Sequence, residues 1–164
     1  MLSHGQMLIG TARYVADSRI GLPMDDEGFG PCLATLRKAG RRFVEAGRLA
    51  ILPEYQNRSL ELSLHLCLYG ISYAMLVGVD DVVSFVVKHH QKFYQKVLMF
   101  ETIASDHSTR YNPNTFGLRL NLKELVQRYE RSRAARKLGL PVFIKDYQAM
   151  QQREQPNVFR SAFN

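Results

Sequence analysis

Hydrophobic positions along this chain fall into short blocks whose spacing predicts alternating strands and helices. Residues 6–16 are rich in β-forming side chains and follow His4-Gly5, a dipeptide suited to a tight turn, so we predict the second strand of a hairpin. Residues 41–52 are dense in Phe, Val, Leu and Ile, which indicates a mostly buried central strand. Between them, residues 30–39 have the composition of a short helix.

The segment 59–77 fits two patterns. Its leucines at even positions from Leu60 to Leu68 alternate as in a strand, whereas Leu60, Leu64, Leu68 and Ile71 share one face of a helix. The apolar pattern runs far beyond the typical strand length of about 5–6 residues. We therefore predict a long buried helix that ends at Gly78.

The second half of the chain continues the alternation. Strands are predicted at 81–87, 100–104 and 115–122, and helices at 89–98 and 122–138. The strict alternation over 115–122 predicts a strand with one exposed face, and Gly139-Leu140-Pro141 is expected to end the last helix. This order predicts an α/β fold around one mixed sheet, with a single domain over residues 1–150 and a polar tail over 151–164.

Composition agrees with one soluble domain. The chain has 164 residues, of which 46% are hydrophobic, enough to bury a core. No apolar run approaches the ~20 residues of a membrane helix, and the N-terminus lacks a secretory pattern, so a cytoplasmic protein is expected. Cys32 and Cys67 lie far apart in the sequence and are expected to be free thiols.

Charge favours an acidic partner. The net charge is +7, and nine basic side chains against four acidic ones follow residue 120, so the last predicted helix is basic. A nucleic-acid-binding module would use such a helix together with Tyr129. No recognition motif is present and aromatic side chains among the basic ones are sparse, which argues against nucleic acid.

Several motifs occur in an order that resembles a known superfamily. The run Arg41-Arg-Phe-Val-Glu-Ala-Gly-Arg-Leu-Ala-Ile-Leu-Pro53, then the long helix, a short strand and His90-Gln-Lys-Phe-Tyr-Gln-Lys-Val-Leu-Met-Phe-Glu101, is similar to the GNAT acyltransferases. Gly10-Thr-Ala-Arg13, Gly21-Leu-Pro-Met-Asp25 and the pairing of Glu45 with Arg48 narrow the resemblance. They point to long-chain N-acyl amino acid synthases, relatives of the acyl-homoserine lactone autoinducer synthases.

The resemblance implies a GNAT-like mixed, splayed central sheet flanked by helices. The superfamily's usual N-terminal strand and two helices are apparently lacking ahead of the predicted hairpin. Two explanations are open: the chain is truncated, or another subunit covers the exposed sheet edge, as in a homodimer.

The same resemblance implies two catalytic residues. An amine must be neutral to attack a thioester, so a carboxylate serves as general base, and Glu45 is the candidate because its apolar strand would raise its pKa toward neutrality. Arg48 points to the opposite face of an ideal strand unless a bulge intervenes. Tyr94 matches a tyrosine that can protonate the leaving thiolate. The competing interpretations are an ion pair of Glu45 with Arg13 and simple aromatic packing of Tyr94.

Donor binding is also expected from the resemblance. The main chain of Leu49, Ala50 and Ile51 would bind the pantetheine arm, and Gln56, Arg58 and Ser59 would lie at its phosphate. Ser59 and Glu61 stand where the superfamily's phosphate motif has small residues, and a carboxylate repels a pyrophosphate. This favours an acyl carrier protein, whose pantetheine carries a single phosphodiester, over coenzyme A.

Basic residues that could attract an acidic carrier are Arg37, Lys38, Arg41, Arg42, Arg58, Lys88, Lys92 and Lys96. No permanently bound cofactor is expected. No metal is expected either, since His89 and His90 diverge by about 100° on a helix.

The predicted function is therefore N-acyl transfer of a long-chain fatty acyl group. The donor would be an acyl carrier protein thioester and the acceptor the amine of an amino acid or similar small amine. Two alternatives are a coenzyme A-dependent N-acetyltransferase and a truncated, non-catalytic relative that binds acyl carriers.

Overall fold

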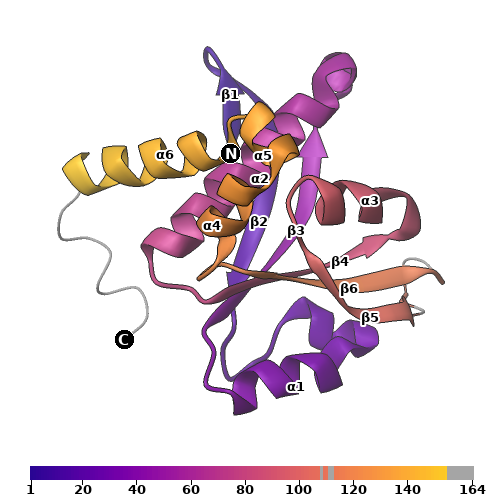
Figure 1. The fold of residues 1–164 in the computed structure, drawn as a ribbon. Helices are drawn as coiled ribbons and strands as arrows, with labels where there is room; N and C mark the ends of the chain where they lie inside the picture. The colour runs from indigo at the N-terminus through magenta and orange to yellow at the C-terminus, as the bar shows by residue number, and fades with distance from the viewer. Residues whose placement is uncertain (108, 111–112, 155–164) are drawn as a thin grey trace.

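The computed structural model describes residues 1–107, 109–110 and 113–154 (Figure 1). Its strands are β1 (Leu2–His4), β2 (Met7–Ala16), β3 (Phe43–Ile51), β4 (Asp81–Val87), β5 (Glu101–His107) and β6 (Thr115–Asn121). Its α-helices are α1 (Gly30–Lys38), α2 (Ser59–Leu76), α3 (Lys88–Lys96), α4 (Leu125–Arg131), α5 (Arg133–Lys137) and α6 (Leu140–Glu154). The predicted mixed α/β layout, with the N-terminal hairpin and the long helix after residue 58, is confirmed.

The strands form one six-stranded sheet in the order β1-β2-β3-β4-β6-β5. Neighbouring strands are antiparallel except β3 and β4, which are parallel and pair over Phe43–Asp81, Val44–Val82 and Glu45–Val83. Beyond these pairs β3 rises steeply while β4 runs toward the side of the molecule (Figure 1). The expected splay of the central sheet is therefore present between β3 and β4.

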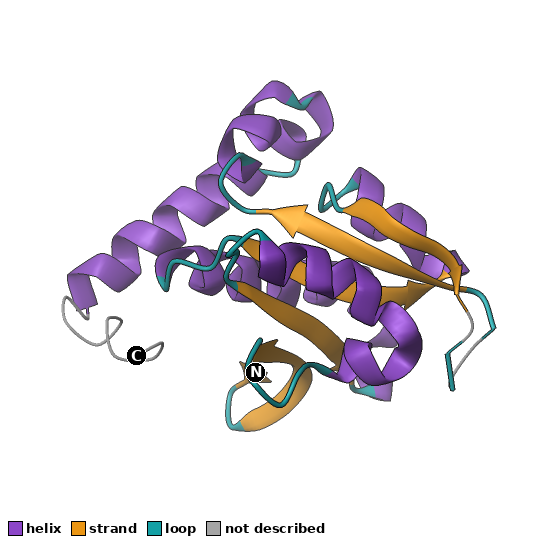
Figure 2. Cartoon of the chain, turned by 90° about the horizontal axis from the view of Figure 1, so that it is seen from below, coloured by secondary structure: helices purple, strands orange, loops and turns teal. Residues whose placement is uncertain are grey.

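Helices cover both faces of the sheet, as the two views show (Figures 1 and 2). Val82 and Val83 are adjacent and both fully buried, yet they belong to different core clusters because successive strand residues face opposite sides. Val82 packs in the cluster of α2, α4 and α6, and Val83 in the cluster of Met24, Phe29 and α1. No helix in the described part of the chain has both the length and the apolar character needed to cross a membrane.

The prediction of an exposed face on the strand at 115–122 is wrong. β6 lies between β4 and β5, and Leu118 and Leu120 are fully buried on one side. On the other side Thr115 is 1% exposed. Alternation reports two faces but not what covers them, and here helices cover both.

The predicted single helix at 122–138 is also wrong. It is divided at Ser132, whose extended backbone (ψ 119°) separates α4 from α5 and whose hydroxyl accepts a hydrogen bond from the Ala135 N–H at 3.2 Å. Gly139-Leu140-Pro141 ends α5 as expected but then starts α6, because proline suits the first turn of a helix. The predicted tail is helical to Glu154, and its remainder lies outside the described residues.

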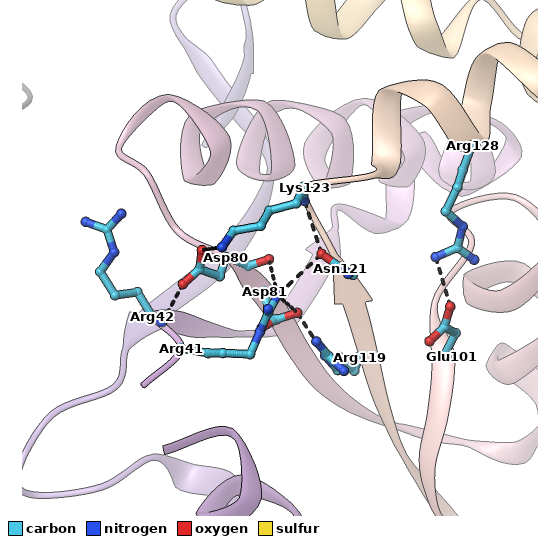
Figure 3. A network of polar contacts seen from close by, with 9 residues as sticks. All are labelled: Arg41, Arg42, Asp80, Asp81, Glu101, Arg119, Asn121, Lys123 and Arg128. Carbon is cyan, nitrogen blue, oxygen red and sulfur yellow. Dashed lines mark hydrogen bonds and ion pairs between the residues drawn. The ribbon is translucent and has the colours of Figure 1, made fainter. Parts of the chain in front are cut away.

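A network of ion pairs lies at the closed end of the splay (Figure 3). Asp81, fully buried, contacts the guanidinium groups of Arg41 and Arg119. Next to it Asp80 accepts a hydrogen bond from the Arg42 N–H at 2.9 Å and pairs with Lys123 at 3.0 Å. These contacts connect the start of β4 to the segment before β3 and to β6 where the parallel pairing begins.

Candidate active site

A bulge in β3 shapes the site. The register between β2 and β3 shifts between Thr11, opposite Ala50, and Arg13, opposite Gly47, so β3 holds one extra residue. Arg48 occupies this stretch with a positive φ of 51°, an uncommon conformation for a residue other than glycine. The bulge removes the simple alternation between Glu45 and Arg48, and both side chains line the same cavity.

The larger of two cavities at the bulge has a volume of about 560 Å³ and lies between the diverging strands and helices α2 and α3. It is lined by five of the residues predicted for donor binding or catalysis: Leu49, Ile51, Gln56, Ser59 and Tyr94. Its deeper wall is apolar and includes Ile71, Leu98 and Phe100. We call it the donor cavity.

Two predicted donor-binding residues lie outside this cavity. The Ala50 side chain lines a small hollow on another part of the surface, with Leu8 and Ile9, although its main chain remains part of β3. Arg58 is exposed and forms a hydrogen-bonded ion pair with Glu61 at 2.8 Å. Arg58 was expected near the donor phosphate and Glu61 was expected to repel that phosphate. In the structure the two side chains are instead bound to each other.

The second cavity, about 440 Å³, is charged. Its lining includes the cationic side chains of Arg13, Arg48 and Arg110 and the carboxylates of Asp26, Glu27 and Glu45. It shares Ala46, Gly47, Arg48 and Phe85 with the donor cavity. The two cavities thus meet at the bulge, and we call the second the acceptor cavity because it is lined by Glu45, the residue predicted to act as the general base toward the acceptor.

Glu45 lies at this junction in an apolar part of the sheet. Its side chain is on the β3 position flanked by Val15 on β2 and Val83 on β4, and the residue is only 2% exposed. Oε2 accepts a hydrogen bond from the Met24 N–H at 2.8 Å. Oε1 lies toward Gly47, where a Cβ would be 3.9 Å away in ordinary van der Waals contact, and both residues line the charged cavity, so this oxygen is approachable from it.

Burial raises the pKa of Glu45 above its ordinary value. The Met24 N–H and the charges of Arg13 and Arg48 act in the opposite direction, while nearby Asp25 adds to the increase. The predicted direction of the shift is confirmed. A carboxylate with a raised pKa and one approachable oxygen is suited to accept a proton.

Tyr94 lines the donor cavity from α3. Its ring makes edge contacts with Phe93 and Phe100, with centroids 5.5 and 5.4 Å apart. Burial, with a smaller contribution from Cys67, raises the pKa of Tyr94, so its hydroxyl keeps its proton at neutral pH. The Tyr94 ring therefore packs against neighbouring aromatic rings, and the residue also lines the donor cavity.

Sequence analysis missed Arg110, which lines the acceptor cavity. Glu27 is 6% exposed, pairs with the Arg110 guanidinium and accepts a hydrogen bond from the Arg110 N–H at 2.9 Å. Asp25 does not line this cavity; it binds Arg37 at 2.7 Å and accepts a hydrogen bond from the Leu22 N–H at 2.8 Å. Arg110 lies 83 residues from Glu27 and follows no period, so no local pattern pointed to it; the acidic cluster at 25–27 is visible in the sequence and could attract a positively charged group of the acceptor.

Five of the remaining basic candidates form two groups. Arg37 and Arg41 are bound to aspartates away from the donor cavity. Lys88, Lys92 and Lys96 are exposed on α3, the helix that also contributes His90 and Tyr94 to the cavity wall.

The His89 and His90 rings lie 3.9 Å apart rather than diverging, and burial lowers the pKa of His90. Among the described residues, no group of three or more potential ligands could hold a metal ion.

Comparison with known proteins agrees with this architecture. A solved structure of FeeM, an N-acyl amino acid synthase from uncultured soil microbes, matches with a TM-score of 0.67 and 24% sequence identity. The match covers 76% of this chain and 71% of that one, and at this identity it establishes the shared fold. Comparison with curated protein sequences gave no match. The family model for N-acyl amino acid synthase FeeM matches residues 1–121. The chain therefore belongs to the FeeM family of N-acyl amino acid synthases and is an N-acyltransferase.

Proposed function

We propose that this chain transfers a fatty acyl group from the pantetheine thioester of an acyl carrier protein to the amino group of an amino acid. The observation that carries the proposal is the meeting of two unlike cavities at the β3 bulge. An apolar cavity suits an acyl chain and its thioester arm, and a charged cavity suits a zwitterionic acceptor. Their shared wall at residues 46–48 is where the two substrates would react.

The acceptor cavity has charges that complement an amino acid. Guanidinium groups recognise carboxylates well, and Arg13 and Arg48 both face this space beside Glu45. The acceptor carboxylate would bind these arginines while its amino group approaches Oε1 of Glu45. An amine without a carboxylate would use only half of this arrangement.

The reaction then needs two proton transfers. Glu45 accepts a proton from the acceptor amine, whose nitrogen attacks the thioester carbonyl carbon. A C–N bond forms and the C–S bond breaks, with the electron pair leaving on sulfur; Tyr94 supplies a hydrogen bond or proton to that sulfur. Main-chain groups of β3 beyond the last parallel pair, Glu45–Val83, are available to hold the pantetheine arm and polarise the carbonyl.

Three features support a carrier protein over coenzyme A. Lys88, Lys92 and Lys96 lie on the helix that borders the donor cavity, and none of them forms an ion pair with the residues that the structure describes. The net charge of +7 attracts an acidic carrier. Arg58 is bound to Glu61 rather than directed at a pyrophosphate. The apolar depth of the donor cavity also favours a fatty chain over the acetyl group of the alternative N-acetyltransferase.

The test supplies matched acyl carrier protein and acyl-coenzyme A donors, together with acetyl-coenzyme A, and a pool of amino acids, and detects products by mass spectrometry. We expect N-acyl amino acids from the carrier donor with the native chain and loss of product with Glu45→Gln. Product from acetyl-coenzyme A alone would replace the proposal with the acetyltransferase alternative. Carrier binding without product would indicate a non-catalytic relative.

The carrier surface has its own test. Lys88→Glu combined with Lys92→Glu should raise KM for the acyl carrier protein about tenfold or more and leave kcat nearly unchanged, because rim charges act mainly on encounter. Lys137→Glu, at an exposed position of α5, is the matched control and should retain the native KM. Equal effects of both changes would contradict docking on α3.

A further inference from the structure

Another apolar cavity, distinct from the charged acceptor cavity, adjoins the donor cavity, and we call it the second cavity in this subsection. It has a volume of about 310 Å³ and is formed between β2 and α2. Its wall includes Ala16, Val44, Leu66, Ala74 and Val77, and none of its lining side chains is charged. An occupant of this space would therefore be a hydrocarbon group rather than an ion or a sugar.

The two cavities share part of their walls. Tyr14 and Ala12 line both of them, and Tyr14 is the one large side chain between Ala12 and Ala16 on that face of β2. Ala12, which carries only a methyl group, is the other residue of this shared wall. Tyr14 thus stands as a partition between the donor cavity and the space behind it.

The Tyr14 ring is held in place by α2. Its hydroxyl donates a hydrogen bond to the Cys67 carbonyl oxygen at 3.3 Å. Its ring fits against Gly70, where a Cβ would lie 2.0 Å from Tyr14 Cζ and 2.2 Å from Oη. Only a glycine at this position lets the ring occupy its place.

We propose that the distal end of a long acyl chain passes Tyr14 beside Ala12 into the second cavity, and that Tyr14 is a specificity-determining residue for chain length. This inference rests on the proposed function, because it needs the donor to carry an acyl chain in the donor cavity. Each methylene buried gains about fourfold in affinity. Filling or enlarging the second cavity should therefore change the preference of the enzyme for long over short acyl chains. Its activity with a single short-chain donor should change less.

The experiment compares carrier donors of increasing saturated chain length, from eight to eighteen carbons, in competition for one amino acid. Ala16→Phe fills the second cavity from an exposed position and should lower the product ratio of the longest to the shortest chain about tenfold or more. Tyr14→Ala removes the partition and should raise that ratio. Tyr14→Phe keeps the ring and should keep the native ratio. Ala39→Phe, exposed at the end of α1, is the matched control and should also keep it.

A second readout does not depend on turnover. Displacement of a fluorescent fatty acid by free fatty acids of the same lengths should show affinity rising with length in the native chain and levelling off earlier in Ala16→Phe. An unchanged length response in Ala16→Phe, in both assays, would overturn the inference. Absence of product from every donor with the native chain would count against the proposed function, and the displacement assay would still decide the role of the second cavity.

Discussion

Glu45 accepts a hydrogen bond from the main-chain N–H of Met24 at 2.8 Å, and Met24 is itself fully buried. The loop between β2 and α1 therefore fixes one oxygen of the carboxylate. The other oxygen lies toward Gly47 and the junction of the two cavities. A base held in this way enters the reaction already oriented.

The raised pKa of Glu45 predicts a pH dependence of activity. The carboxylate is the active form, so kcat/KM should increase with pH along a limb centred above the ordinary glutamate value of 4.5. Glu45→Gln should lower kcat/KM about 10²–10⁴-fold and abolish this limb. A limb at the ordinary value, or one retained in the variant, would exclude Glu45 as the base.

The same residue should limit stability. Because its native pKa is raised, the contribution of Glu45 to the free energy of unfolding is fully present below pH 4.5 and is lost as pH rises through the native pKa. A neutral glutamine can still accept from the Met24 N–H. We expect Glu45→Gln to unfold in urea at neutral pH at a denaturant concentration equal to or above that of the native chain. Clear destabilisation would show that the charge supports the fold.

Removing a guanidinium from the acceptor cavity should affect acceptors selectively. Arg48→Gln is expected to raise KM for an amino acid about tenfold, as for one lost charge-assisted contact. KM for the corresponding decarboxylated amine and for the donor should change little. Steady-state kinetics with both acceptors measures this, with Arg136→Gln on exposed α5 as the control. Equal increases for the two acceptors would mean that Arg48 does not bind the carboxylate.

The Asp81 ion pairs at the closed end of the splay and the separate Glu101–Arg128 pair between β5 and α4 should be unequal in strength (Figure 3). Asp81→Asn leaves two arginines without their buried partner and should lower the free energy of unfolding by about 3 kcal/mol. Glu101 pairs with Arg128 at 3.0 Å but is 58% exposed, so Glu101→Gln should cost at most about 1 kcal/mol. Urea denaturation of both variants compares them directly, and similar losses would contradict this ranking.

Ser72 offers a stabilising substitution. Its hydroxyl oxygen is the one buried side-chain polar atom without a hydrogen-bond partner among the described residues, and the residue lies inside α2. Alanine removes this polar atom and has a higher helix propensity, so Ser72→Ala should raise the free energy of unfolding by about 1 kcal/mol. Thermal unfolding should show a midpoint about 2–4 °C higher. A lower midpoint would mean that the hydroxyl is satisfied in solution.

Local periodicity predicted most elements because burial on a strand or helix leaves a pattern within a few residues. The strand at 81–87 and the helix from Ser59 were found in this way. The position of Glu45 in an apolar strand likewise predicted the direction of its pKa shift. The covering of β6 could not be predicted, since it depends on which strands and helices lie beside it.

The site was predicted less completely for a related reason. Leu49, Gln56 and Tyr94 come from regular elements and reached the donor cavity. Arg110 comes from an irregular segment and meets Glu27 across 83 residues. Such pairings depend on the closure of the whole fold, which no local pattern contains. Arg48 was predicted in part. The sequence allowed a bulge that would bring its side chain to the same side as Glu45, but alternation alone could not show where in the strand the bulge lies.

The short parallel pairing of β3 with β4 has a consequence for how the molecule moves. Two antiparallel units, β1-β2-β3 and β4-β6-β5, meet there through only three residue pairs in the described part of the chain. An opening motion at this seam would widen or narrow the gap between the strands and leave every antiparallel ladder intact. Amide hydrogens of the two units should then exchange as separate cooperative groups, and a bulky hydrocarbon tail can enter without either unit unfolding.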